Sequence, residues 1–204
     1  MNSNTTNTNI LITGVGGQGV LTLAEILAKT ALADRLNVRV GEIHGMAQRG
    51  GHVVCTVRIG ENVYGPIIDS GTADLVIGFE PLETLREVQA ISKSGYVVMS
   101  SHIQYPVDVS MGKSEYPANE EIMTQMQMFT ENILEFNAMN LAKKAGSSRS
   151  MNMVMLGAVL GTHLTPLRKE AALESVHLSF SSKFESINTT AVELGYGALR
   201  DIFQ

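Results

Sequence analysis

Residues 10–20 read Ile-Leu-Ile-Thr-Gly-Val-Gly-Gly-Gln-Gly-Val, and this stretch decides the fold. Ile10 to Ile12 form an unbroken apolar run, as in strands that are buried on both faces of a parallel sheet. From Val20 to Leu32 the apolar residues recur at helical spacing. The sequence therefore predicts a strand, a glycine turn and a helix in direct succession.

The glycine turn is a candidate anion-binding site, because it delivers unpaired N–H groups and the positive end of a helix dipole to one point. Glycine has no Cβ, so the backbone can turn sharply and approach a ligand closely. A tight turn that packs helix against strand and binds nothing is the alternative. The candidate residues are Gly14, Gly16, Gly17, Gln18 and Gly19.

Length and composition indicate a globular α/β protein. The chain has 204 residues, of which 44% are hydrophobic and 17% charged, so a sizeable core is expected. Residues 1–9 are rich in Asn, Thr and Ser and are expected to form a disordered tail before one domain over residues 10–204. We expect a three-layer α/β/α fold with a mostly parallel sheet, one β-hairpin insertion and a helical C-terminal part.

The charge pattern argues against nucleic acid, and the apolar runs argue against a membrane. The net charge is −5, and no Lys/Arg cluster could contact successive phosphates. No apolar run is long enough to span a bilayer, and the N-terminus has no apolar export signal. A cytoplasmic protein is expected.

Cys55 is the single cysteine, which excludes an internal disulfide and an iron–sulfur cluster ligated by this chain's own cysteines. It lies in an alternating apolar run from 53 to 59. We interpret it as a small buried hydrophobic residue rather than a reactive thiol.

NAD binding is one hypothesis for the turn. Gly14, Gly16 and Gly19 fit the pattern G-x-G-x-x-G, and a second parallel strand is predicted at 37–41. Glu42 follows that strand, about 20 positions past the glycines, where dinucleotide-binding folds place the acid that holds the ribose.

The loop at 43–51 departs from that plan and suggests a second anion-binding element. Gln48, Arg49, Gly50 and Gly51 place an amide and a planar cation between small residues, which suits a loop that binds an anionic group. A solvated loop is the alternative. We predict that a hairpin of 52–59 and 63–68 follows directly.

The remaining elements continue the α/β pattern and then become helical. Helical spacing over 151–161 is apolar nearly all round, which predicts a buried helix whose glycines allow another backbone to approach closely. Glu80 and Glu83 open a helix at a strand's carboxyl edge, where capping and solvated-face roles are favoured over ligand contact. Predicted strands are 73–78, 96–99 and 133–136, with an extended stretch or edge strand near 107–110. Predicted helices are one that opens at Glu80-Pro81, extends through Ile91 and is ended by Ser94-Gly95, then 119–129, 138–145, one from Thr165-Pro166, and one from about Ser182.

No set of catalytic residues is recognisable. The chain lacks a Gly-x-Ser-x-Gly elbow and a lysine after the glycine turn. His44 and His52 have no partners at metal-ligand spacing, so we predict structural roles for them and no metal site. An anion-binding loop without reaction chemistry suggests one part of a larger enzyme.

Residues 14–20, 45–51 and 194–196 resemble the gamma domain of the 2-oxoacid:ferredoxin oxidoreductases. Residues 63–68 and 73–85 are more similar still to the small (beta) subunits of the indolepyruvate-specific branch. The likeness extends from about residue 9 to 196, which identifies residues 10–204 as a gamma-type domain.

This resemblance implies a subunit of an enzyme that converts a 2-oxoacid into an acyl-CoA, CO2 and reduced ferredoxin. Thiamine diphosphate, Mg and the 4Fe-4S clusters would then reside in a large (alpha) partner subunit, and the isolated chain would be inactive and could form homo-oligomers. Indolepyruvate is the implied substrate, with pyruvate or another 2-oxoacid as the alternative. Coenzyme A would lie in a shared cleft at the glycine turn and residues 48–51; further candidates there are Arg149, Ser150 and Asn152.

Overall fold

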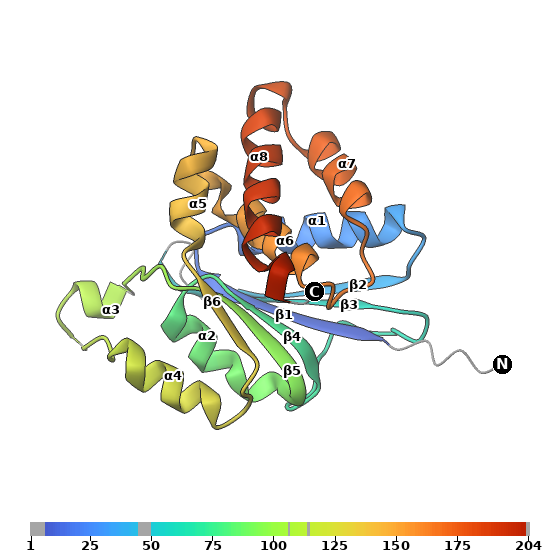
Figure 1. The fold of residues 1–204 in the computed structure, drawn as a ribbon. Coiled ribbons are helices and arrows are strands. Elements are labelled where there is room, and N and C mark those ends of the chain that lie inside the picture. The colour runs from blue at the N-terminus through green and yellow to red at the C-terminus, as the bar shows by residue number, and fades with distance from the viewer. Residues whose placement is uncertain (1–6, 45–49, 106, 114, 203–204) are drawn as a thin grey trace.

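The computed structural model describes residues 7–44, 50–105, 107–113 and 115–202. Within them, six strands form one sheet in the order β2-β3-β1-β4-β5-β6 (Figure 1). The strands are β1 (Thr8–Val15), β2 (Val38–His44), β3 (His52–Ile59), β4 (Ala73–Gly78), β5 (Ile91–Ser100) and β6 (Ile133–Phe136).

Four neighbouring strands of the sheet are parallel, as predicted. β1, β4, β5 and β6 run in one direction, whereas β3 is antiparallel to both β1 and β2. β2 therefore has the direction of β1 but does not neighbour it. The structure confirms the α/β class with a mostly parallel sheet.

The predicted hairpin of 52–59 with 63–68 is wrong, because β3 has neighbouring strands on both edges. The hairpin insertion consists of β2 and β3. Residues 63–68 form no strand and are held by side chains of β3: Thr56 Oγ1 donates to the Pro66 carbonyl (2.7 Å) and Arg58 Nη1 to the Ile67 carbonyl (2.9 Å).

Helices cover both faces of the sheet (Figure 1). One face is covered by α1 (Val20–Ala33), α5 (Ala138–Ala145), α6 (Met151–Gly161), α7 (Lys169–Ser179) and α8 (Ser182–Leu199). The other carries α2 (Pro81–Glu87), α3 (Val107–Ser110) and α4 (Asn119–Gln127). No helix among the described residues is both long and apolar enough to cross a membrane.

Helix α6 is buried along its whole length, as its sequence predicts. It packs on α8 through glycines: a Cβ on Gly157 would collide with the Val192 carbonyl, and one on Gly195 with the Val154 carbonyl. The predicted close approach of a second backbone is confirmed, and the partner is α8.

Two predicted elements differ from the structure: one helix ends earlier than expected, and one predicted strand is a helix. The helix expected to reach residue 91 ends at Glu87, and Ile91 already begins β5 by pairing with Ala73. Residues 107–110 form α3 instead of an edge strand. The outer edge of β5 is taken by β6, whose Ile133 pairs with Val97.

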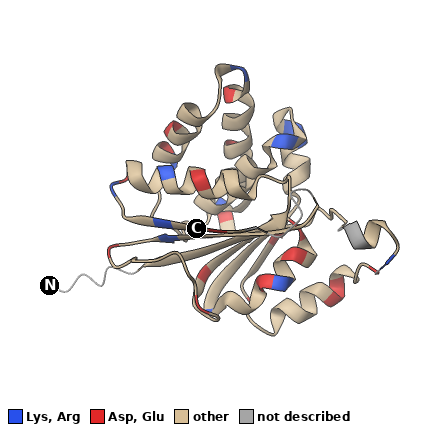
Figure 2. Cartoon of the chain, turned by 180° about the vertical axis from the view of Figure 1, so that it is seen from behind, with Lys and Arg blue, Asp and Glu red and all other residues tan. Residues whose placement is uncertain are grey.

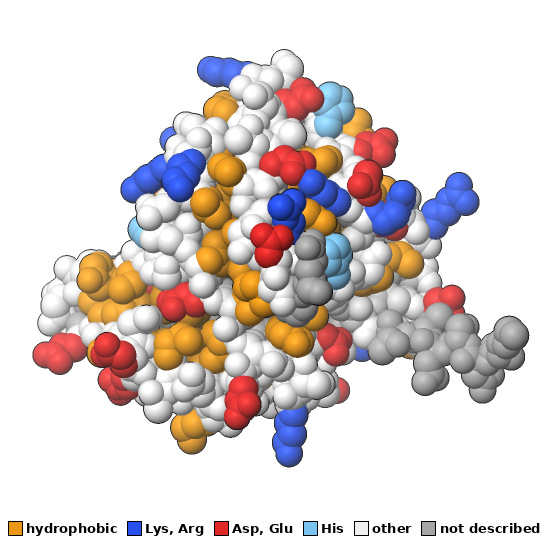
Figure 3. Space-filling view, viewed as in Figure 1, with side chains coloured by type: hydrophobic (Ala, Val, Ile, Leu, Met, Phe, Trp, Pro, Cys, Tyr) orange, Lys and Arg blue, Asp and Glu red, His pale blue; other side chains and the backbone are white. Residues whose placement is uncertain are grey.

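Acidic and hydrophobic residues are unevenly distributed over the surface. Acidic residues predominate on α2 and α4, with few basic ones among them (Figure 2). Hydrophobic side chains reach the surface on the face that carries α3, α4 and β6 (Figure 3). The exposed large hydrophobic residues at the ends of α3 and α4 are Met111, Met128 and Phe129.

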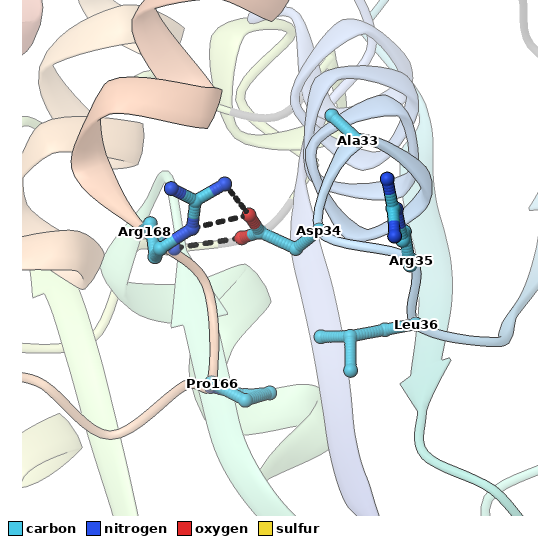
Figure 4. Close-up of a pocket in the computed structure, with 6 residues that line it drawn as sticks. All are labelled: Ala33, Asp34, Arg35, Leu36, Pro166 and Arg168. Atoms are coloured by element: carbon cyan, nitrogen blue, oxygen red, sulfur yellow. Dashed lines mark hydrogen bonds and ion pairs between the residues drawn. The ribbon is translucent and has the colours of Figure 1, made fainter.

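Asp34 fixes the start of α7, which begins at Lys169 and not at Thr165-Pro166 (Figure 4). The buried Asp34 carboxylate accepts from the Arg168 main-chain N–H (2.9 Å) and from its guanidinium (2.6 Å). The Thr165 hydroxyl, by contrast, is buried without a partner among the described residues and caps nothing. A pocket of about 460 Å³ beside this pair lies at the opposite end of α1 from the glycine turn.

The Asp34–Arg168 contact predicts unequal effects of substituting its two members. Asp34→Ala should lower the free energy of unfolding by about 2 kcal/mol, because it removes a charged acceptor from both the main-chain N–H and the guanidinium of Arg168. Arg168→Ala should cost about 0.5 kcal/mol, because the guanidinium is mostly exposed. Thermal unfolding of both variants tests this, and equal shifts in Tm would contradict it.

Candidate functional site

The glycine turn joins β1 to α1 through backbone conformations that favour glycine. Gly17 and Gly19 have φ values of +103° and +90°. Residues that carry a Cβ rarely adopt this left-handed backbone conformation. Gly14 lies inside β1, where a Cβ would be 2.8 Å from the Cβ of Phe79, so its role is close packing.

The side chain of Gln18 stabilises the turn through two hydrogen bonds to the main chain. Its Oε1 accepts from the Val15 N–H (2.7 Å), and its Nε2 donates to the Phe79 carbonyl (3.4 Å). The structure therefore gives this predicted site residue a role in holding the turn between β1 and the end of β4.

The two glycine motifs meet, as the sequence predicts for a shared site. The Gly16 N–H donates to the Gly51 carbonyl (2.8 Å), and the Gly50 N–H donates to the Gly16 carbonyl (3.4 Å). These bonds extend the pairing of β1 with β3 past Val15 and His52. Gln48 and Arg49 lie outside the described residues.

Several N–H groups at the turn have no hydrogen-bond acceptor among the described residues. Within the described chain, no main-chain bond engages the amides of Gly17 and Gly19, and the first intrahelical bond of α1 is donated by Leu23. The amides of residues 20–22 are therefore the unpaired donors of a helix N-terminus. Together with the helix dipole they favour an anionic group.

A pocket of about 460 Å³ opens at this turn. Asn152 at the start of α6 is 7% exposed and lines the pocket. Its Oδ1 accepts from the Met153 N–H (3.0 Å), whereas its Nδ2 has no acceptor among the described residues. The lining residues are Gly17, Gln18, Gly19, Thr22, Gln104, Met139, Ser148, Arg149, Met151 and Asn152.

Arg149 and Asn152 bring the side-chain donors of the pocket, and sequence resemblance had placed both near the site. No ion pair engages Arg149 within the described ranges, so its guanidinium is available to an anion. Ser150 is turned inward, with its hydroxyl donating to the Ser147 carbonyl (2.7 Å). Thr22 and Gln104 escaped the sequence analysis, and no motif marks either of them.

A charged cluster lies under β1 and β3, on the face that carries α2. Both ring nitrogens of His52 face carboxylates: Nδ1 contacts Glu83, and Nε2 lies 2.8 Å from Glu87. These hydrogen bonds, first that of Glu83, raise the pKa of His52 to about 9. The predicted structural role of His52 agrees with these contacts.

Glu80 caps α2, as the sequence predicts, but it is also fully buried. Its Oε2 accepts from the Glu83 N–H (3.0 Å), and its Oε1 accepts from the Tyr116 hydroxyl (2.5 Å). Burial raises the pKa of Glu80, against the effect of these hydrogen bonds. Glu80 and Glu83 are thus enclosed in the fold, whereas His52 and Glu87 are partly exposed.

The order of the strands argues against the NAD-binding hypothesis, because it separates Glu42 from the glycine turn. Glu42 lies in β2 opposite Cys55 of β3, and Cys55 lies opposite Ile12 of β1. Two strand spacings of about 5 Å therefore separate Glu42 from the strand that leads into the glycine turn. In a dinucleotide-binding fold the two strands would be neighbours.

Residues 9–198 match the family described as pyruvate ferredoxin/flavodoxin oxidoreductase, and the chain belongs to this family. The fold and the glycine turn described above are thus those of a subunit of an oxidoreductase. The chain is 42% identical to the indolepyruvate oxidoreductase subunit IorB of Pyrococcus horikoshii, over 95% of this chain and 96% of that relative.

Solved structures share the fold at low sequence identity. The gamma subunit of a keto/oxoacid ferredoxin oxidoreductase from Geobacter sulfurreducens is 22% identical, with a TM-score of 0.67, over 94% of this chain and 97% of that one. The 2-oxoglutarate:ferredoxin oxidoreductase from Magnetococcus marinus, with 2-oxoglutarate, coenzyme A and succinyl-CoA bound, gives a TM-score of 0.72 at 20% identity. It aligns with 97% of this chain over 32% of its own length, so the same fold is there part of a longer polypeptide.

Proposed function

We propose that the chain is the small subunit of an indolepyruvate:ferredoxin oxidoreductase and that its glycine turn binds coenzyme A in a cleft shared with a large subunit. The main support for the proposal is a set of hydrogen-bond donors at one pocket, with no recognisable catalytic side chain beside them among the described residues. Free main-chain amides, an arginine and a buried amide face one pocket. The similarity to IorB supports indolepyruvate as the substrate.

The pocket's donors fit the phosphates of coenzyme A. Helix N-terminal amides and a guanidinium are the groups that proteins use for phosphate oxygens. The Nδ2 of Asn152 adds a neutral donor next to Gly19. In the proposed role these groups bind and orient the coenzyme, and Gln48 and Arg49 stay sequence-based candidates for the same site.

The chain's residues do not fit an iron–sulfur cluster. Cys55 is fully buried in β3, and desolvation raises the pKa of its thiol to about 12, so the thiolate needed for ligation is disfavoured. A large subunit that carries the clusters and thiamine diphosphate, which would supply the decarboxylation chemistry, is therefore part of the proposal. The exposed hydrophobic side chains at the ends of α3 and α4 are compatible with such a partner.

Reconstitution tests the proposed function. The chain and the proposed large subunit would be mixed under anoxic conditions, and ferredoxin reduction with indolepyruvate and coenzyme A would be followed. We expect no activity from the small subunit and a large gain, at least tenfold over the large subunit alone, from the mixture. Activity of the large subunit that is unchanged by this chain would refute the proposal.

The same assay distinguishes the substrates. Pyruvate is the second candidate substrate, because the family that the chain matches is described as pyruvate ferredoxin/flavodoxin oxidoreductase. We expect kcat/KM for indolepyruvate to exceed that for pyruvate in the mixture. A higher kcat/KM for pyruvate would still support the subunit role but would identify pyruvate as the substrate.

A further inference from the structure

We propose that His52 is a positioning residue for the glycine turn: its ring, held by two carboxylates of α2, fixes the end of β3 that hydrogen-bonds Gly16. The importance of this role for coenzyme A rests on the proposed function. Its structural basis does not, because all the contacts lie within the described part of this chain.

The first step of the argument is the charge of the ring. Carboxylates accept hydrogen bonds and do not donate them, so a ring with Glu83 at Nδ1 and Glu87 at Nε2 must donate from both nitrogens. Such a ring is an imidazolium. The side chain of Glu83 is 4% exposed, and an unpaired carboxylate there would be costly.

The second step is the connection from this ring to the turn. His52 pairs with Val15 in the sheet, and the preceding Gly51 accepts from the Gly16 N–H. On the other side, α2 is tied to β1, because the Thr13 hydroxyl donates to the Glu83 carbonyl (3.3 Å). A fixed His52 thus fixes the strand end against which the turn is folded.

The third step is the set of charged groups around the ring. Besides Glu83 and Glu87, α2 contributes Arg86, 3.5 Å from Glu83, and the helix is preceded by Glu80, which Tyr116 engages. From the sheet, Glu42 of β2 lines the same groove as Glu87. Of these groups, Glu83 and Glu87 favour the protonated ring, whereas Arg86 is mostly exposed.

Protonation should therefore control the turn at alkaline pH. The pKa of His52 in the folded chain lies above its ordinary value of 6.5, so both hydrogen bonds are intact at neutral pH, and one of the two is lost as the pH rises through about 9, because a neutral ring has only one N–H. Glu87→Gln removes one carboxylate while keeping an acceptor for Nε2. It should lower the midpoint of this transition by roughly one pH unit.

Carbon-detected NMR of the isolated chain tests the coupling. The non-exchangeable Cε1–H signal of His52 and the Cα signals of Gly16 and Gly51 would be followed from pH 6 to 10.5. We expect one shared midpoint near pH 9 in the wild type and a shared, lower midpoint in Glu87→Gln. Glycine signals that do not follow the His52 midpoint would overturn the proposal.

Hydrogen exchange at neutral pH separates positioning from general destabilisation. His52→Gln should speed exchange of the Gly16 and Gly50 amides about tenfold and leave α6 and α8 unchanged. His177→Gln is the matched control, since His177 pairs with Glu185 (2.7 Å) at an exposed site. Uniformly faster exchange, or none at Gly16 and Gly50, would also overturn the proposal.

The reconstituted complex gives the functional readout. His52→Gln should raise the KM for coenzyme A about three- to tenfold with little change in the KM for the 2-oxoacid. If the NMR coupling holds but the KM for coenzyme A is unchanged, His52 still positions the turn, and the placement of coenzyme A there is refuted instead.

Discussion

Asn152→Asp should raise the KM for coenzyme A of the reconstituted complex by roughly 10- to 100-fold. The substitution keeps the shape of the side chain but replaces a free donor, beside Gly19, with a negative charge. Losing a hydrogen bond to a charged group costs about 1.5–3 kcal/mol, and each 1.4 kcal/mol is a factor of ten. Repulsion between the new carboxylate and a phosphate adds to this loss. Steady-state kinetics with varied coenzyme A measures it.

Asn188→Asp provides the control, because Asn188 in α8 has the same exposed fraction of 7% and does not line the pocket. It should leave the KM for coenzyme A unchanged, even if the subunit unfolds at a lower temperature. The KM for the 2-oxoacid should stay constant in both variants. Equal effects of the two substitutions on coenzyme A would show that the pocket at Gly19 is not its binding site.

Gly157→Val should strongly destabilise the folded chain. The added side chain would collide with main-chain atoms of α8 at Val192 and Tyr196, which cannot move aside as a flexible side chain could. A clash of this kind belongs to the rare substitutions that cost more than about 4 kcal/mol. For a chain of this length the expected loss is at least 8 °C in Tm, at about 2–4 °C per kcal/mol.

Gly197→Ala is the matched glycine variant for that experiment. Gly197 is an exposed residue of α8, and open space surrounds the position of its Cβ. We expect an unchanged or slightly higher Tm, because alanine is the better helix former. Circular dichroism and thermal unfolding of both variants decide the matter. A Gly157→Val chain with wild-type Tm would mean that α6 and α8 do not pack as described.

The partners of the glycine turn were predictable in part. The sequence marks Gly50 and Gly51 as a second motif, and the structure brings them to Gly16. Sequence could not reveal that Gln18 braces the turn, because Phe79 comes from a strand about 60 residues away. The sequence predicted a structural role for His52 but could not name its partners, because Glu83 and Glu87 lie on a helix that the chain reaches later.

The sequence by itself determined the elements whose signal is local. The strand–turn–helix unit at 10–32, the all-apolar helix α6 and the final helix follow from periodicity and glycine placement, since these depend on neighbours within a few turns. The resemblance carried by its motifs placed the chain in the family that the comparison confirms.

Tertiary structure alone decided how the strands pair and which donors share the pocket. The apolar alternation of β3 is the same whether its neighbour is β1, β2 or residues 63–68, because hydrogen bonds between strands involve the backbone and not the side chains. That choice placed β3 between β1 and β2 and so moved Glu42 away from the glycine turn. It is also the packing of α6 against the start of α1 that brings Asn152, more than 130 residues away in sequence, to Gly19.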